Sequence, residues 1–209
     1  MKRFKFFLFF VFINLFSFVK ADSPMTSPIF YTVYESEAIV KKAQHANGVM
    51  TDELMEYIAN ESNPIALKLA IINVLNFDMV DVTMDNYCKF LKYLKQRYDA
   101  LFDVELYRKI DASTMVSLAY LRGVCDYMDV EEALKMALIA REKDPESKAI
   151  SIVIGLIKSQ KAFLYDDNWC NVWVAFGEEV FFRESNDDFD LFAVFSIAEY
   201  IDRYAKYCP

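Results

Sequence analysis

Glycine and proline are scarce in this chain: its 209 residues contain four glycines and five prolines. A β-sandwich or β-barrel needs frequent turns, and glycine and proline supply most of them. The scarcity therefore excludes a turn-rich β fold and favours long helices. The abundant apolar residues exclude disorder, except in the short segment at 24–28, which holds two of the prolines.

Histidine is almost absent, and no two cysteines are close in sequence. His45 is the single histidine, so any Ser-His-Asp or Cys-His site would have to use it. A lone histidine near the end of a predicted helix is more typical of a surface role. No Cys-x-x-Cys pair, glycine-rich phosphate loop or calcium loop occurs. We therefore predict no catalytic, cofactor-binding or metal-binding residues.

The first 21 residues have the pattern of a secretory signal peptide. Lys2, Arg3 and Lys5 precede an uncharged run over 6–19, and Val19-Lys20-Ala21 predicts cleavage before Asp22. The run is shorter than the roughly 20 residues that a membrane span needs. We therefore expect export to the periplasm or cell exterior, and no membrane span after cleavage.

Cleavage would make the chain more acidic. It removes Lys2, Arg3, Lys5 and Lys20 and no acid, which changes the net charge from −8 to −12. Such a surface repels nucleic acid and anionic lipid, favours solubility and could attract a basic partner. The expected partner is another protein, with no nucleic acid.

The four cysteines permit two disulfides. Cys88, Cys125, Cys170 and Cys208 are an even number in a chain expected in an oxidising compartment. In a stacked helical array each hairpin contacts its sequence neighbours, which favours Cys88 with Cys125 and Cys170 with Cys208. The alternative for the first pair is two buried thiols.

Apolar periodicity predicts helices along most of the chain, after an extended tail at 22–32. Residues 33–209 are expected to form one α-helical domain. Thr51 and Asp111 are predicted N-caps, and Asp129 with Glu132 resembles a capping box. The predicted helices span 33–46, 52–60, 64–76, 84–98, 101–110, 112–127, 129–143, 147–163, 166–183 and 189–206. In the ninth, Val, Trp and Phe would also suit a strand.

The helix over 64–76 is apolar nearly all round, which predicts a central position. The other core positions follow the helical periodicity. The residues predicted to be buried are Leu67, Ala70, Ile71, Val74, Leu91, Leu94, Ala133, Ala137, Ile154 and Leu156.

One stretch resembles a junction between two tetratricopeptide repeats. Ala133 and Ala140 match small residues where paired helices approach closely, Pro145 matches the proline between repeats, and Gly155 matches the small residue ten places later. Tyr120-Leu121 departs from the Leu-Gly pair of the family. The resemblance covers 129–155 and implies stacked antiparallel hairpins and protein binding, without catalysis. We expect the helices over 129–143 and 147–163 to pack antiparallel as neighbours, with Ala140 and Gly155 near their contact. HEAT-like pairs or an irregular bundle share these features.

A second resemblance lies in the segment after the predicted cleavage site. Its pattern Ser-Pro-x-Thr-Ser-Pro-x-Phe-Tyr is similar to the start of uncharacterised secreted proteins of Bacteroidota-type bacteria. This likeness implies no activity.

Paired acids and a group of aromatic residues are the remaining candidates for a site. A carboxylate hydrolase needs two carboxylates, and the candidate pairs are Asp166-Asp167, Glu178-Glu179 and Asp187-Asp188. The aspartates also suit helix N-termini, and the glutamates suit a solvated face. A sugar or peptide surface could use aromatic residues that are more often core at helical spacing, namely Trp169, Trp173, Phe176, Tyr200 and Tyr204.

These observations leave three hypotheses for function. The first is a non-enzymatic protein-binding module built as a helical array. The second is an acidic inhibitor or immunity-type protein that covers a basic enzyme. The third is a carboxylate hydrolase, for which the acid pairs are weak support.

Overall fold

Helices make up all the regular secondary structure of the described chain. The computed structural model describes residues 23–77 and 83–209, which contain ten α-helices, two 3-10 helices and no strand. The predicted all-α fold class is thereby confirmed. The predicted signal segment, residues 1–21, lies outside the described residues.

The helix bounds agree with the predicted ranges within a few residues, with two exceptions. The helices expected over 33–46 and 189–206 are each divided into a 3-10 helix and a shorter α-helix. In chain order the elements are η1 (Tyr31–Tyr34), α2 (Ala38–His45), α3 (Asp52–Ile58), α4 (Ile65–Phe77), α5 (Thr83–Arg97), α6 (Asp103–Lys109), α7 (Ala112–Cys125), α8 (Glu131–Lys143), α9 (Lys148–Tyr165), α10 (Cys170–Val180), α11 (Leu191–Ile201) and η2 (Asp202–Tyr207).

Two predicted N-caps are confirmed. The hydroxyl of Thr51 accepts a hydrogen bond from the Leu54 N–H at the start of α3. The carboxylate of Asp111 accepts one from the Thr114 N–H at 2.9 Å at the start of α7. Each cap satisfies a backbone donor that the first helical turn leaves without a partner.

The predicted capping box at the start of α8 is wrong. The helix begins at Glu131, with Val130 as its N-cap residue and no side-chain cap. Glu132 instead forms an ion pair with Arg122 of α7 at 3.3 Å. A carboxylate that can reach a guanidinium on the neighbouring helix is drawn to it, and the capping position is lost.

The segment predicted as an extended tail packs into the interior. Met25 and Phe30 are fully buried. The Asn73 side chain of α4 holds this segment: its Oδ1 accepts hydrogen bonds from the backbone N–H groups of Phe30 and Tyr31, both at 3.1 Å. Apolar burial and a buried amide together order a stretch that lacks helical periodicity.

A second buried amide fastens the start of this segment to α9. The Oε1 atom of Gln160 accepts hydrogen bonds from the Ser23 hydroxyl at 2.5 Å and from the Met25 N–H at 3.3 Å. Its Nε2 donates to the carbonyl of Tyr127 at 3.0 Å. The described N-terminal residues are therefore part of the packed core.

The core lies along α4, α7 and α9. Eight of the ten predicted core residues are buried, and α4 is central as predicted. Leu67 and Leu91 are only partly buried and pack against the core from outside.

Hairpins join α7 to α8 and α8 to α9. A Cβ added at Gly123 of α7 would lie 3.4 Å from the Cβ of Ala133 on α8, so small residues allow these helices to approach closely. Ala140 is fully buried. Pro145 is exposed in the connector to α9, where it ends α8 as the sequence suggested.

Gly155 allows a close helix contact, but not with the expected partner. It was predicted to lie between α8 and α9. A Cβ at this position would instead lie 3.1 Å from Phe176 Cδ2 and 3.3 Å from Val180 Cγ2, both on α10. The reason is that Gly155 lies on the side of α9 that α10 covers, and α9 packs most extensively against α10.

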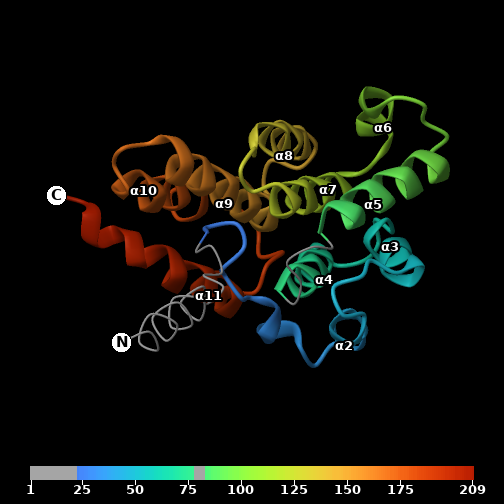
Figure 1. The fold of residues 1–209 in the computed structure, drawn as a ribbon, viewed down its shortest axis with the longest axis horizontal. Helices are drawn as coiled ribbons and strands as arrows, with labels where there is room; N and C mark the ends of the chain where they lie inside the picture. The colour runs from blue at the N-terminus through green and yellow to red at the C-terminus, as the bar shows by residue number, and fades with distance from the viewer. Residues whose placement is uncertain (1–22, 78–82) are drawn as a thin grey trace, which may run out of the picture.

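Figure 1 shows α2, α3, α5 and α6 toward one end of the molecule, and α4, α7 and α9 in the middle. The orange α10 and the red α11 lie at the other end. This arrangement leaves α10 and α11 with few neighbours on their outer sides.

Candidate functional site

Of the acids considered for hydrolysis, Asp188 and Asp166 bond to groups near helix ends, whereas Asp167 and Asp187 are exposed. Asp188 is bound to the start of α9: its Oδ1 accepts a hydrogen bond from the Ala149 N–H at 2.9 Å, and its Oδ2 accepts one from the Ser147 hydroxyl at 2.5 Å. Asp166 accepts a hydrogen bond from the Asn171 side chain at 2.8 Å. These are stabilising roles at helix ends.

Glu179 was predicted to lie on a solvated face, and this is wrong. It is buried, and it forms ion pairs with Arg141 of α8 at 2.8 Å and with Lys158 of α9. Its neighbour Glu178 is exposed. Burial of a carboxylate requires charged or hydrogen-bonding partners, and two cations supply them here. The triad ties α10 to the two preceding helices.

Asp166 and Glu178 line a shallow hollow of about 300 Å3. Lys158 and Lys161 line the same hollow. A carboxylate hydrolase needs two facing acids, and in this hollow the two acids share the lining with two lysines.

His45 is exposed at the end of α2. Its Nδ1 lies 2.6 Å from the carbonyl oxygen of Lys41, one turn earlier in the same helix. This contact anchors the ring to its own helix.

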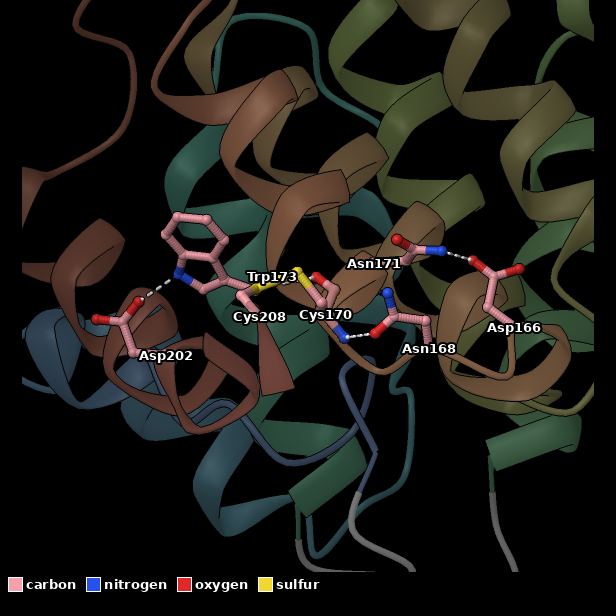
Figure 2. The surroundings of a disulfide bond; sticks show 7 residues. All are labelled: Asp166, Asn168, Cys170, Asn171, Trp173, Asp202 and Cys208. Atoms are coloured by element: carbon pink, nitrogen blue, oxygen red, sulfur yellow. Dashed lines mark hydrogen bonds between the residues drawn. A yellow bond between two sulfur atoms is a disulfide. The ribbon is translucent and has the colours of Figure 1, made fainter. Parts of the chain in front are cut away.

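The C-terminal end of the chain is bonded to α10. Cys170, the first residue of α10, forms a disulfide with Cys208, which confirms this predicted pairing. Asn168 Oδ1, just before α10, accepts a hydrogen bond from the Cys170 N–H at 3.0 Å (Figure 2). The start of α10 and the end of η2 are thereby held together.

The second predicted disulfide is not formed. Cys88 on α5 and Cys125 at the end of α7 carry thiols. Cys88 is exposed, whereas Cys125 is partly buried, and burial raises the pKa of the Cys125 thiol to about 12. The two side chains thus sit in different environments although α5 and α7 are in contact.

Trp173 forms a second link between α10 and η2. Its indole Nε1 donates a hydrogen bond to Asp202 Oδ1 at 2.9 Å, and Figure 2 shows the ring lying beside the disulfide. The indole is 40% exposed. A large amphipathic ring is thus held in one orientation at the surface.

Trp173 and Asp202 belong to the wall of a cleft between α10 and α11 that we call the α10–α11 groove. Its volume is about 460 Å3. Phe176 and Ile201 are buried, whereas Phe181 and Phe182 are 55% and 85% exposed. The lining residues are Trp173, Val174, Phe176, Gly177, Glu178, Phe181, Phe182, Ala198, Ile201 and Asp202.

Exposed apolar side chains continue along α11 beyond the groove. Leu191, Phe192 and Phe195 are 61%, 73% and 54% exposed. Together with the groove they make a large apolar area at one end of the molecule. Surfaces of this kind commonly mark binding sites in proteins.

The predicted aromatic group is divided by the structure. Phe176, Tyr200 and Tyr204 are buried, whereas Trp173 lines the groove. Trp169 is partly exposed and packs against other rings. Phe181 and Phe182 were not among the predicted site residues. Two consecutive phenylalanines at a helix end rarely both point into the core, so the pair itself indicated that at least one ring is exposed.

Comparison of the chain with protein-family models, curated proteins and solved structures finds no match. Among the described residues, no group of three His, Cys, Asp or Glu side chains could hold a metal ion. None of the helices in residues 23–77 and 83–209 has the length and apolarity that crossing a membrane requires. The α10–α11 groove is therefore the candidate functional site.

Proposed function

We propose that this chain is an exported, non-enzymatic helical protein that binds another protein through the α10–α11 groove. The observation that carries this proposal is the set of exposed rings, Trp173, Phe181 and Phe182, around a floor that includes Phe176. Aromatic side chains dominate the binding energy of protein interfaces when a partner covers them. Solvent-exposed rings in a fixed cleft suit that role.

Two links support a preformed groove. The Cys170–Cys208 disulfide and the hydrogen bond from Trp173 to Asp202 both join α10 to η2. A wall that is already ordered loses little conformational entropy when a partner binds.

The compartment is supported by the chemistry of the cysteines and by the first residues of the sequence. A disulfide between Cys170 and Cys208 is compatible with an oxidising compartment. The signal-peptide pattern of 1–21 predicts delivery to such a compartment. The hairpins α7–α8 and α8–α9 support a stacked helical architecture like that of the repeat family, as a scaffold for the groove.

The test compares two phenylalanines that are both well exposed. Phe182 lies in the groove, whereas Phe102 is 72% exposed at the start of α6. Residues 22–209 would be used as bait with exported proteins of the native organism. We expect the wild type and Phe102→Glu to retain the same partner and Phe182→Glu to lose it. Equal capture by all three would overturn the proposal.

An inhibitor that covers a basic enzyme is a second candidate. It is favoured by the acids of the groove, since the charged lining residues, Glu178 and Asp202, are both acidic. The same capture experiment separates this candidate, because its partner would be an enzyme whose activity falls when the complex forms.

A further inference from the structure

The α10–α11 groove offers apolar contacts and few free hydrogen-bonding groups. Most of its lining residues lie on α10, α11 and η2, whose backbone groups are largely paired internally. At the end of α10, the Phe181 N–H donates to the Gly177 carbonyl, and the Val180 carbonyl accepts from Lys148 Nζ. A segment that enters the groove must therefore satisfy its own backbone. An α-helix does so, whereas an extended strand would leave donors and acceptors unpaired.

The charged groups at the groove have one sign. Glu178 and Asp202 are both exposed, and none of the lining residues is basic. Asp202 Oδ1 accepts the hydrogen bond from Trp173. We therefore expect Glu178 to be the acid that contributes more to a charged contact with a partner. A partner with lysine or arginine beside its apolar face would complement these acids, whereas an acidic partner would be repelled.

The exposed face of α11 indicates the length of the partner. Leu191, Phe195, Ala198 and Asp202 follow one another at intervals of four, three and four residues, which places them on one side of the helix. Leu191 and Phe195 are exposed, and Ala198 and Asp202 line the groove. At 1.5 Å per residue this stripe extends about 16 Å, or about three helical turns.

We propose that the α10–α11 groove takes a cationic amphipathic helix of a partner protein. Leucine or aromatic side chains of this helix fill the groove over Phe176 and Ile201, and lysine or arginine beside them faces Glu178 and Asp202. This inference rests on the proposed function, because it specifies the chemistry of the partner at the same groove.

The test uses synthetic peptides of about 14 residues, enough for three turns with short ends. The first has leucines on one face and lysines on the other, the second replaces each lysine by glutamate, and the third places a proline at the centre. Calorimetric titration of residues 22–209 measures each dissociation constant. We expect the lysine peptide to bind at least about tenfold more tightly than the glutamate peptide and the proline peptide.

Matched variants locate the binding. Phe182→Ala should weaken the lysine peptide about tenfold, and Phe102→Ala should not. Glu178→Lys should weaken it about fivefold relative to Glu142→Lys, which makes the same charge change at an exposed position on α8. Equal effects of the two charge reversals would show attraction to net charge alone and would overturn the proposal. Equal binding of the proline peptide would overturn the helical partner.

Two further results separate this inference from the proposed function. Loss of the native partner in Phe182→Glu, combined with no preference among the peptides, would leave the groove as a protein-binding site and overturn only its cationic helical partner. Phe182-dependent binding to zwitterionic phosphatidylcholine vesicles, without peptide binding, would assign the surface to lipid and overturn both. A change in Trp173 fluorescence in a Trp169→Phe variant reports occupancy of the groove in each case.

Discussion

Helices α9 and α11 are both strongly apolar, yet α9 is mostly buried and α11 is partly exposed. α9 contains three lysines and is covered by α7, α8 and α10, so most of its side chains are buried. α11 contains a single charged residue, Glu199, and within residues 23–77 and 83–209 its main helix contacts are with η1, α10 and η2. Leu191, Phe192 and Phe195 consequently remain exposed.

The more apolar helix is thus the more exposed one. α9 is buried because three helices pack against it, whereas the described part of the chain leaves the outer face of α11 uncovered. Exposed apolar area of this size lowers solubility unless a partner covers it. The difference teaches that surplus apolar surface at the end of a helical stack is better evidence of binding than the apolar content of any one helix.

The largest expected effect tests the difference between α9 and α11 by placing the same charged residue in each helix. Ile154→Asp in α9 puts an unpaired carboxylate at a fully buried position and should lower the free energy of unfolding by roughly 4 kcal/mol or more. Phe195→Asp in α11 should change it by less than about 0.5 kcal/mol. Urea denaturation followed by circular dichroism measures both. A large loss in Phe195→Asp would show that α11 is covered in solution.

The next effect concerns the disulfide that holds the exposed end. The double variant Cys170→Ser/Cys208→Ser removes a crosslink between residues 38 apart, and loop-closure entropy predicts a loss of about 3–4 kcal/mol. Cys88→Ser, at an exposed thiol, is the control and should change stability by less than about 0.5 kcal/mol. Guanidinium denaturation of the three proteins measures the differences, and equal midpoints would contradict the prediction.

A third change tests the contact between α9 and α10. Gly155→Leu adds a side chain where even a Cβ would lie 3.1 Å from Phe176. Overpacking of this contact should cost about 1–3 kcal/mol. Thermal unfolding checks this, and an unchanged melting temperature would mean that α9 and α10 are less tightly packed than described.

The fourth prediction concerns the buried amine of Lys68. Burial lowers the pKa of Lys68 on α4 to about 8, and the nearby carboxylate of Asp111 opposes this shift. Below pH 8 the amine is charged in both the folded and unfolded states, so the unfavourable burial is fully present. Between pH 8 and 10.5 the folded amine is neutral while the unfolded chain keeps its proton, so stability rises with pH.

Lys68→Met lacks this group and serves as the reference. The stability of the wild type relative to Lys68→Met should increase on the order of 1–2 kcal/mol from pH 7 to pH 9.5. Titration of Cys125 and of the buried tyrosines is common to both proteins and cancels in the difference. A difference that does not change with pH would show that Lys68 titrates normally.

Local patterns were sufficient to predict most of the fold. Thr51 and Asp111 cap their helices because an N-cap depends only on residues within one turn. The near-continuous apolar sequence of α4 correctly predicted its central position. The Cys170–Cys208 pairing was predicted because hairpins in a stack contact their sequence neighbours, but the same argument wrongly paired Cys88 with Cys125.

The groove could not be predicted in the same way. Whether Glu179 is solvated depends on Arg141 and Lys158, which come from two other helices. Whether Phe182 is covered depends on where α11 lies after the connector 181–190, to which Phe182 itself belongs. Neither the solvation of Glu179 nor the exposure of Phe182 depends on residues within one helical turn. Helical periodicity therefore predicted the wrong environment for Glu179 and did not predict the exposed phenylalanines.

The smallest expected effect concerns Gly177, which we compare with Gly155. Gly177 lies on α10 in the wall of the groove, where an added Cβ would be 3.9 Å from Phe182 Cε2, an ordinary contact distance. Because alanine has a higher helix propensity than glycine, Gly177→Ala should stabilise the protein by about 0.5–1 kcal/mol. Gly155→Leu and Gly177→Ala should therefore shift the melting temperature in opposite directions. Destabilisation by Gly177→Ala would mean that the space at Gly177 is filled in solution, which would contradict an open groove between α10 and α11.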